Sequence, residues 1–88
     1  MNKPETERME GETYEYYSLG RYIVRAKGVC GGRPTFKHTR IEVNGTLDRL
    51  DAGEDIDDIV RGYKGLVRKE AILEAMELAK TSSVLNVA

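Results

Sequence analysis

The chain has one cysteine, Cys30, and one histidine, His38, and their side chains are the first to consider for catalysis. A thiol and an imidazole can act together as a nucleophile and its general base. Such a pair also needs a third group that orients the base, and no carboxylate stands at a spacing that indicates one. A structural zinc site wants four Cys or His ligands. We therefore expect no catalytic residue, no metal and no cofactor, and Cys30 as a small, half-buried apolar residue.

Two other polar clusters have structural explanations. Asp55, Asp57 and Asp58 look like calcium ligands, but the glycine and glutamate of a calcium loop do not follow at the required spacing. They fit the cap and first turn of a helix, where the helix dipole favours negative charge. Gly31 and Gly32 lack the lysine and the helix start of a phosphate-binding loop.

The remaining chemistry is that of basic residues, which are unevenly distributed. The chain has a net charge of −1. Residues 1–19 carry two basic residues and five glutamates, residues 20–41 carry six basic residues and no acid, and residues 42–62 carry two basic residues and seven acids. A segregated chain can present a basic face although its total charge is near zero. The alternative is a surface whose charges neutralise one another.

Length and composition indicate one small cytoplasmic domain. The 88 residues can bury only a thin core, so we expect a homodimer to add stability. The single cysteine rules out an internal disulfide and suggests a reducing compartment. No apolar run reaches the roughly 18 residues of a membrane helix. We expect a flexible acidic tail at 1–12, one domain at 13–80 and a C-terminal tail at 81–88.

The residues after the acidic tail favour strands. Aromatic and β-branched residues are frequent in 13–26, with the strongest strand signal at 22–24. A glycine and proline turn follows at 31–34, and the alternation in 39–43 predicts a strand that pairs back with 22–24. Three tyrosines could form a binding stack, but the packing face of a small sheet is the favoured interpretation: Tyr14, Tyr16 and Tyr17.

The second half of the chain has helical periodicity. Asn44 is the expected N-cap of a first helix at 45–52. Asp55 is expected to cap a second helix, whose apolar residues recur at i, i+3, i+4 and i+7 up to Tyr63. A longer third helix is expected at 66–80. The predicted fold is therefore mainly α, with a small N-terminal β-hairpin.

A short helix, a glycine-containing turn and a longer helix with basic residues in its first turn are the pattern of a helix-turn-helix. In such units the second helix enters the DNA major groove. Arginine can read guanine there, and lysine mainly contacts phosphate. The alternative is a plain helical hairpin with solvated basic residues. The expected DNA-binding residues in this part are Arg61, Lys64, Arg68 and Lys69.

The sequence resembles the small proteins of domain of unknown function family 433. The motifs that carry the resemblance are VCGGRP at 29–34 and TRI at 39–41, together with Tyr22, Ile23, Val43, Leu50, Gly53, Ile56, Ile59, Tyr63 and the alanines of the last helix. The resemblance implies a homeodomain-like three-helix fold preceded by a short hairpin. It also implies an antitoxin of a type II toxin–antitoxin pair, whose partner is a PIN-domain-like ribonuclease and which represses its own promoter.

The sequence departs from the family pattern at two places. His38 replaces the glycine that precedes Thr-Arg, so we expect an ordinary negative φ there. Lys64, Gly65 and Leu66 replace a proline and a capping Ser or Thr before the last helix. The basic residues of the expected hairpin loop can face DNA, an acidic protein surface or water, and we keep these alternatives open: Arg33, Lys37 and Arg40.

Two functions follow from these patterns. The first is a dimeric antitoxin that binds its own operator as double-stranded DNA and also binds a toxin. The second is a protein–protein interaction module that sequesters a partner or scaffolds an oligomer without binding DNA. The expected partner-binding residues are the three tyrosines of the N-terminal strand and the apolar C-terminal tail: Tyr14, Tyr16, Tyr17 and Leu85.

Overall fold

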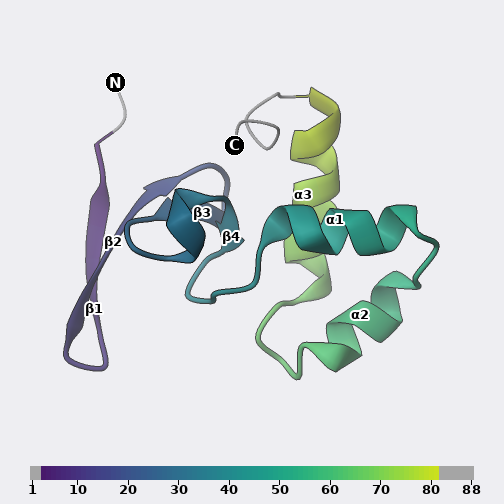
Figure 1. The fold of residues 1–88 in the computed structure, drawn as a ribbon, viewed down its shortest axis with the longest axis horizontal. Coiled ribbons are helices and arrows are strands. Elements are labelled where there is room, and N and C mark those ends of the chain that lie inside the picture. Colours follow the sequence, from purple (N-terminus) through teal and green to yellow (C-terminus); the bar gives the residue numbers. More distant parts are fainter. Residues whose placement is uncertain (1–2, 82–88) are drawn as a thin grey trace.

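The computed structural model describes residues 3–81, which form a four-stranded antiparallel sheet and three α-helices (Figure 1). The expectation of a mainly α fold with a small hairpin, built as a homeodomain-like helix-turn-helix, is therefore wrong. The chain has an α+β fold, because its first eighteen residues contribute two strands that the sequence did not fully reveal.

The sheet has the order β1-β2-β3-β4, so each strand pairs with the next one along the chain. The strands are β1 (Glu5–Met9), β2 (Glu12–Ser18), β3 (Ile23–Ala26) and β4 (Thr35–Phe36). Glu10 and Gly11 join β1 to β2, with φ values of 51° and 83°. Positive φ at both positions is typical of the tight two-residue turn that matches the twist of a hairpin. Residues 5–12, which were expected to belong to an acidic tail, thus form β1, the turn and the first residue of β2.

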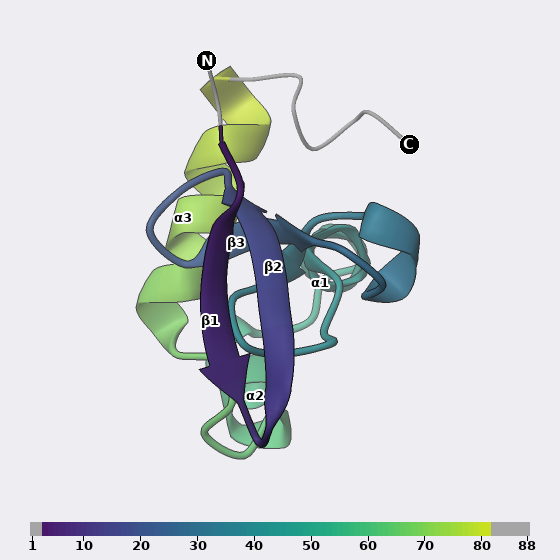
Figure 2. The same ribbon diagram turned by 90° about the vertical axis from the view of Figure 1, so that its left-hand side faces the viewer.

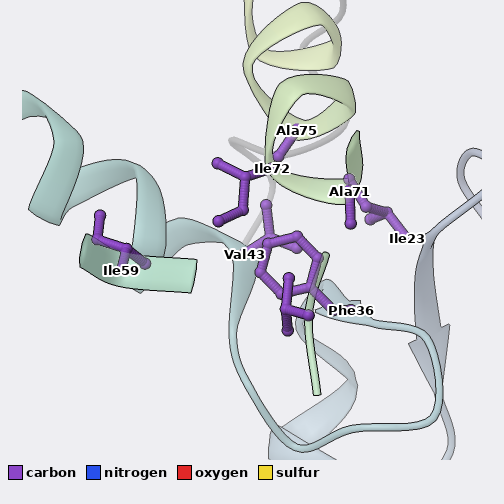
Figure 3. Close-up of a cluster of buried hydrophobic side chains, with 8 residues drawn as sticks. Ile23, Phe36, Val43, Ile59, Ala71, Ile72 and Ala75 are labelled. Atoms are coloured by element: carbon purple, nitrogen blue, oxygen red, sulfur yellow. The ribbon is translucent and has the colours of Figure 1, made fainter. Parts of the chain in front are cut away.

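The two faces of the central strand β3 pack against different layers. Ile23 lies in a cluster with Phe36 and residues of the three helices, shown in Figure 3, where Ala71 and Ile72 of the last helix approach Phe36 and Val43. Val24 and Ala26 point the other way and pack with Tyr16 of β2. Figure 1 shows the result: the β1–β2 hairpin lies on one side of β3 and β4, and the helices lie on the other.

The helices follow the apolar periodicity, although two of their ends differ from the prediction. They are α1 (Val43–Asp51), α2 (Ile56–Gly62) and α3 (Lys69–Thr81). The side chain of Asp55 accepts a hydrogen bond from the Asp57 amide at 2.8 Å, so the predicted cap of α2 is confirmed. Asn44 is not an N-cap, because α1 begins two residues earlier than predicted, with Glu42 at the N-cap position and Val43 buried. The third helix begins at Lys69, later than expected.

The segment before α1 contains a turn in place of the expected strand 39–43. β4 pairs with β3 instead, and only Glu42 forms a bridge with Thr35. His38 has a φ of 67°, so the expectation of a negative φ is wrong. The hydroxyl of Thr39 donates to the Phe36 carbonyl at 2.7 Å and closes this turn. A short 3-10 turn, η1 (Cys30–Gly32), precedes β4.

A carboxylate fastens α3 to the start of β3. Glu74 accepts hydrogen bonds from the amides of Arg21 at 2.8 Å and Tyr22 at 2.7 Å. Gly20 allows this approach, because a Cβ there would lie 2.7 Å from Cδ of Glu74. Within residues 3–81, no helix has both the length and the hydrophobicity needed to cross a membrane.

Candidate functional site

Two of the four basic residues expected to bind DNA form ion pairs with α2. Nζ of Lys69 lies 3.2 Å from Oδ1 of Asp57, and Arg61 pairs with Asp58 one turn earlier in the same helix. The aspartates stand in the first turn of α2, where the helix dipole favours them. The corner between α2 and α3 therefore combines positive and negative charge.

The other two basic residues of this corner are exposed and make no ion pair with a described residue. Lys64 lies in the turn after α2 with a φ of 52°, and Arg68 directly precedes α3. The carbonyl of Arg68 accepts a hydrogen bond from the Ala71 amide at 3.0 Å, which places Arg68 at the N-cap position. Only Lys64 and Arg68 of the expected four are thus free of a carboxylate partner.

The three basic residues of the predicted hairpin loop have different surroundings. Arg33 binds Glu42 through two nitrogens at 2.7 and 3.3 Å, and this pairing raises the pKa of Arg33 and lowers that of Glu42. Nζ of Lys37 lies 5.1 Å from the ring centre of Tyr16. Arg40 is exposed and has no side-chain partner among the described residues. These residues do not form one continuous basic surface.

The tyrosines of β2 also separate. Tyr14 and Tyr16 lie on one face of the hairpin with ring centres 4.9 Å apart, and Tyr16 is buried. Tyr17 lies on the opposite face and is 43% exposed. The favoured interpretation of a packing face holds for Tyr16, and the three rings form no single stack. Leu85 lies outside the described residues.

Glu7 of β1 is the centre of a cluster that attaches the hairpin to the rest of the fold. It accepts a hydrogen bond from the Tyr16 hydroxyl, and its other oxygen lies 2.8 Å from Nε2 of His38. Nζ of Lys37 is 3.6 Å away. The hydrogen bond from Tyr16, and then that from His38, lowers the pKa of Glu7. Glu7 was not predicted as a site residue, because nothing in the sequence around it indicates partners at positions 16 and 38.

The His38 backbone takes part in the same attachment. Its amide donates to the hydroxyl of Tyr14 at 3.0 Å, and the two rings are 5.5 Å apart. Cys30 is half-buried, as expected, and its thiol donates to the Arg40 carbonyl at 3.2 Å. Among residues 3–81, no three His, Cys, Asp or Glu side chains come together in a group that could hold a metal ion.

A surface hollow of about 480 Å³ lies where the hairpin tip meets the loops after β3 and β4. We call it the hairpin hollow. Its lining includes Tyr14 and His38 and four charged side chains that make no ion pair with a described residue: Glu10, Glu12, Lys27 and Arg40. The hollow therefore presents both signs of charge, and none of these four charges is neutralised in direct contact.

Comparison with known proteins places most of the fold in one family. No curated protein and no solved structure matches the chain. The family described as "Protein of unknown function (DUF433)" matches residues 23–79, from the start of β3 almost to the end of α3. β1 and β2 precede the matched segment. The match confirms the resemblance found in the sequence, and the chain belongs to the DUF433 family.

Proposed function

We propose that the chain is a protein–protein interaction module, which holds a partner protein through its β1–β2 hairpin. The observation that carries the proposal is the hairpin hollow, with unneutralised acidic and basic side chains on one surface. Folded proteins carry both signs of charge, and complementary pairing gives specificity between protein surfaces. A nucleic acid is a polyanion, and the acidic residues of the hollow would repel it.

The charges of the helical corner support the same choice. In helix-turn-helix proteins the first of the two helices crosses the DNA backbone. Here the corresponding helix, α2, is capped by Asp55 and has Asp57 and Asp58 in its first turn. These carboxylates would face phosphate, and two of them already pair with Arg61 and Lys69.

In this proposal the chain is an antitoxin and its partner protein is the matching toxin, as the family resemblance implies. The chain would be co-expressed with the proteins encoded by its two flanking genes, and co-elution would be measured by size-exclusion chromatography. Reversing Glu10 and Glu12 to lysine should abolish co-elution. Reversing Lys64 and Arg68 to glutamate changes the same number of charges at the helical corner and should leave it intact. The opposite pattern would contradict the proposal.

A second candidate is an antitoxin that also binds its own operator DNA as a homodimer. The exposed, unpaired Lys64 and Arg68 at the start of α3 favour it. It predicts tighter binding to the upstream duplex than to a scrambled one, with an affinity that falls steeply with salt. Arg68→Ala should relax sequence preference, and Lys64→Ala should weaken binding to all sequences alike. Fluorescence anisotropy at several salt concentrations measures both effects, and equal binding to the two duplexes would exclude this candidate.

A further inference from the structure

Strand β2 is longer than its pairing with β3. β3 pairs with Tyr16–Ser18, whereas all of β2 up to Tyr16 pairs with β1 on its other side. The last backbone hydrogen bond on the β3 side runs from the Lys27 amide to the Glu15 carbonyl at 2.9 Å. The chain then turns away at Gly28, whose φ is 74°. The first residues of β2 therefore have a strand on one side only.

Thr13 has the backbone groups that this arrangement leaves open. In a strand, the N–H and C=O of alternate residues point to the same side. Since the Glu15 carbonyl points to the β3 side, the N–H and C=O of Thr13 do as well. Across the hairpin, Thr13 stands opposite Arg8, and the two-residue turn makes the neighbouring Met9 and Glu12 the hydrogen-bonded pair. Among residues 3–81, no backbone group outside this hairpin bonds to the Thr13 backbone.

The hairpin hollow occupies the place where β3 would continue. Extending the register that pairs Tyr16 with Ala26 would put residue 29 opposite Thr13, and both Thr13 and Val29 line the hollow. The chain itself does not follow that line, because it bends at Gly28. One open position of the β-ladder thus borders a hollow of about 480 Å³.

We propose that the hairpin hollow binds an extended peptide segment of a partner protein, which adds to β2 at Thr13 as a short antiparallel strand. The peptide's backbone would exchange two hydrogen bonds with Thr13, as strands do when they extend a sheet. An acidic side chain of the peptide would meet Lys27 or Arg40, and a basic one would meet Glu10 or Glu12. This inference rests on the proposed interaction function and names the site and chemistry of its partner.

The outer edge of β1 is the competing place for an added strand. Thr6 and Arg8 direct their backbone N–H and C=O groups outward there, since the alternate residues of β1, such as Glu7, direct theirs toward β2. That edge follows Pro4 and carries charged side chains, devices with which proteins discourage strand addition. β1 is the outermost strand of the sheet, with β2 between it and β3 (Figure 1). Figure 2 shows β1 and β2 side by side in front of the rest of the fold.

The probe for this proposal is the peptide acetyl-Asp-Val-Thr-Val-Lys-amide, written in the direction that brings its lysine to the acidic hairpin tip. It would be titrated into the isotope-labelled full chain, and amide shifts would be followed by NMR. We expect a saturable shift of the Thr13 amide. Acetyl-Lys-Val-Thr-Val-Asp-amide has the same composition with its charges exchanged, and should bind more weakly.

Thr13→Pro is the direct test, because proline removes an N–H that the hairpin does not use. The affinity of this variant for the peptide should be about three- to tenfold lower, which is the effect of losing one hydrogen bond. Arg8→Pro removes the equivalent outward N–H from β1 and should leave the affinity unchanged. If Thr13→Pro does not fold, the charge reversals Lys27→Glu and Arg40→Glu serve as the test in its place. They should also lower the affinity for the peptide.

Three results would overturn the inference: no saturable shift, shifts confined to the Thr6 and Arg8 amides, or unchanged affinity in Thr13→Pro and in the charge reversals. The proposed function fails separately. If these variants still co-elute with a protein partner at wild-type levels, the interaction module stands and the hollow is not its site. If the peptide binds as expected but the wild-type chain captures neither flanking protein, peptide binding in the hollow is supported and the proposal of a toxin partner fails.

Discussion

The hairpin and the helical corner handle their charges in opposite ways. At the corner between α2 and α3, acidic and basic residues approach closely enough to pair, as Lys69 does with Asp57 at 3.2 Å. In the hairpin hollow, Glu10, Glu12, Lys27 and Arg40 share one surface without pairing. Neutralised charges at a surface contribute little stability or recognition. Unpaired charges remain available to a partner, and the hollow presents them with both signs, whereas the corner presents only the two cations Lys64 and Arg68. The hairpin is therefore the better candidate for binding a protein.

The two regions also differ in their relation to the core. The helices and one face of β3 share the main apolar cluster around Phe36. The hairpin depends on a second, smaller cluster around Tyr16 and on the polar contacts of Glu7. This difference predicts that damage to the main core unfolds everything, whereas damage to the hairpin's attachment is local.

The largest expected effect is that of Phe36→Ala. Phe36 is 2% exposed and touches both the sheet and the helices, so truncation should cost about 3 to 5 kcal/mol. Because a small domain has about 5 to 15 kcal/mol of stability, a large part of it should be lost. Urea unfolding followed by circular dichroism measures the change. Tyr17→Ala, at a site 43% exposed on the hairpin, should stay within about 0.5 kcal/mol.

If amides of the hairpin keep their hydrogen-exchange protection in Phe36→Ala after those of α3 have lost it, the hairpin would be stable by itself. The hairpin would then not depend on the main core.

Gly20→Ala should have the next largest effect. The added Cβ would lie 2.7 Å from Cδ of Glu74, so that carboxylate must move away from the amides of Arg21 and Tyr22. Each lost hydrogen bond to a charged group costs about 1.5 to 3 kcal/mol. Part of this cost is offset here, because the half-buried carboxylate and amides can form hydrogen bonds with water instead. Gly45→Ala is the matched control, because no atom lies within 4 Å of its Cβ position in α1. It should stabilise by about 0.5 to 1 kcal/mol.

In a Glu74→Ala background, Gly20→Ala should become nearly neutral, since no carboxylate remains to be displaced. A cost that persists there would show that the strain comes from the backbone and not from this contact.

The helical half was the more predictable one, for a physical reason. Its signals are local: apolar residues recur every three to four positions, and Asp55 caps the helix that it precedes. β2 is marked by its aromatic residues, but β1 has no such signal, because most of its side chains are exposed and no apolar alternation runs along it. Its stability depends on Glu7, whose partners at positions 16 and 38 are distant in sequence.

The candidate site could be predicted only in part for the same reason. The basic residues can be picked out of the sequence as a class, but which of them form ion pairs depends on how α2 meets α3. The φ of His38 was predicted wrongly, because residue type alone favours a negative value. In the folded chain the Tyr14 hydroxyl and the Glu7 carboxylate hold His38 in the left-handed region.

Acid pH should release the hairpin before it affects the core. The pKa of Glu7 is lowered by its hydrogen bonds with Tyr16 and His38, so the folded state favours the ionised form. The resulting stabilisation is fully present above the ordinary glutamate pKa of about 4.3 and is lost as the pH falls through the lower, folded-state pKa. The protection of the β1 and β2 amides from hydrogen exchange, taken relative to their intrinsic rates at each pH, should therefore fall below about pH 4.

The lowered pKa values of Glu42 and Glu54 contribute in the same range, so a control is needed. Glu7→Gln should remove the part of the pH dependence that is specific to the hairpin and leave the rest. If the hairpin amides of this variant respond to acid as those of the unmodified chain do, Glu7 does not govern the attachment.

The smallest effect on stability is expected for Asp57→Asn. The pair with Lys69 is exposed on both sides, and such pairs contribute about 0 to 1 kcal/mol. The charge change has a larger consequence for binding, because it frees Lys69 and removes a carboxylate from the start of α2. The affinity for double-stranded DNA should rise at low salt, measured by fluorescence anisotropy. Asp48→Asn makes the same charge change in α1 and should raise the affinity for DNA less. An equal rise in affinity in both variants would mean that net charge, and not the ion pairs at this corner, keeps the helical half from binding DNA.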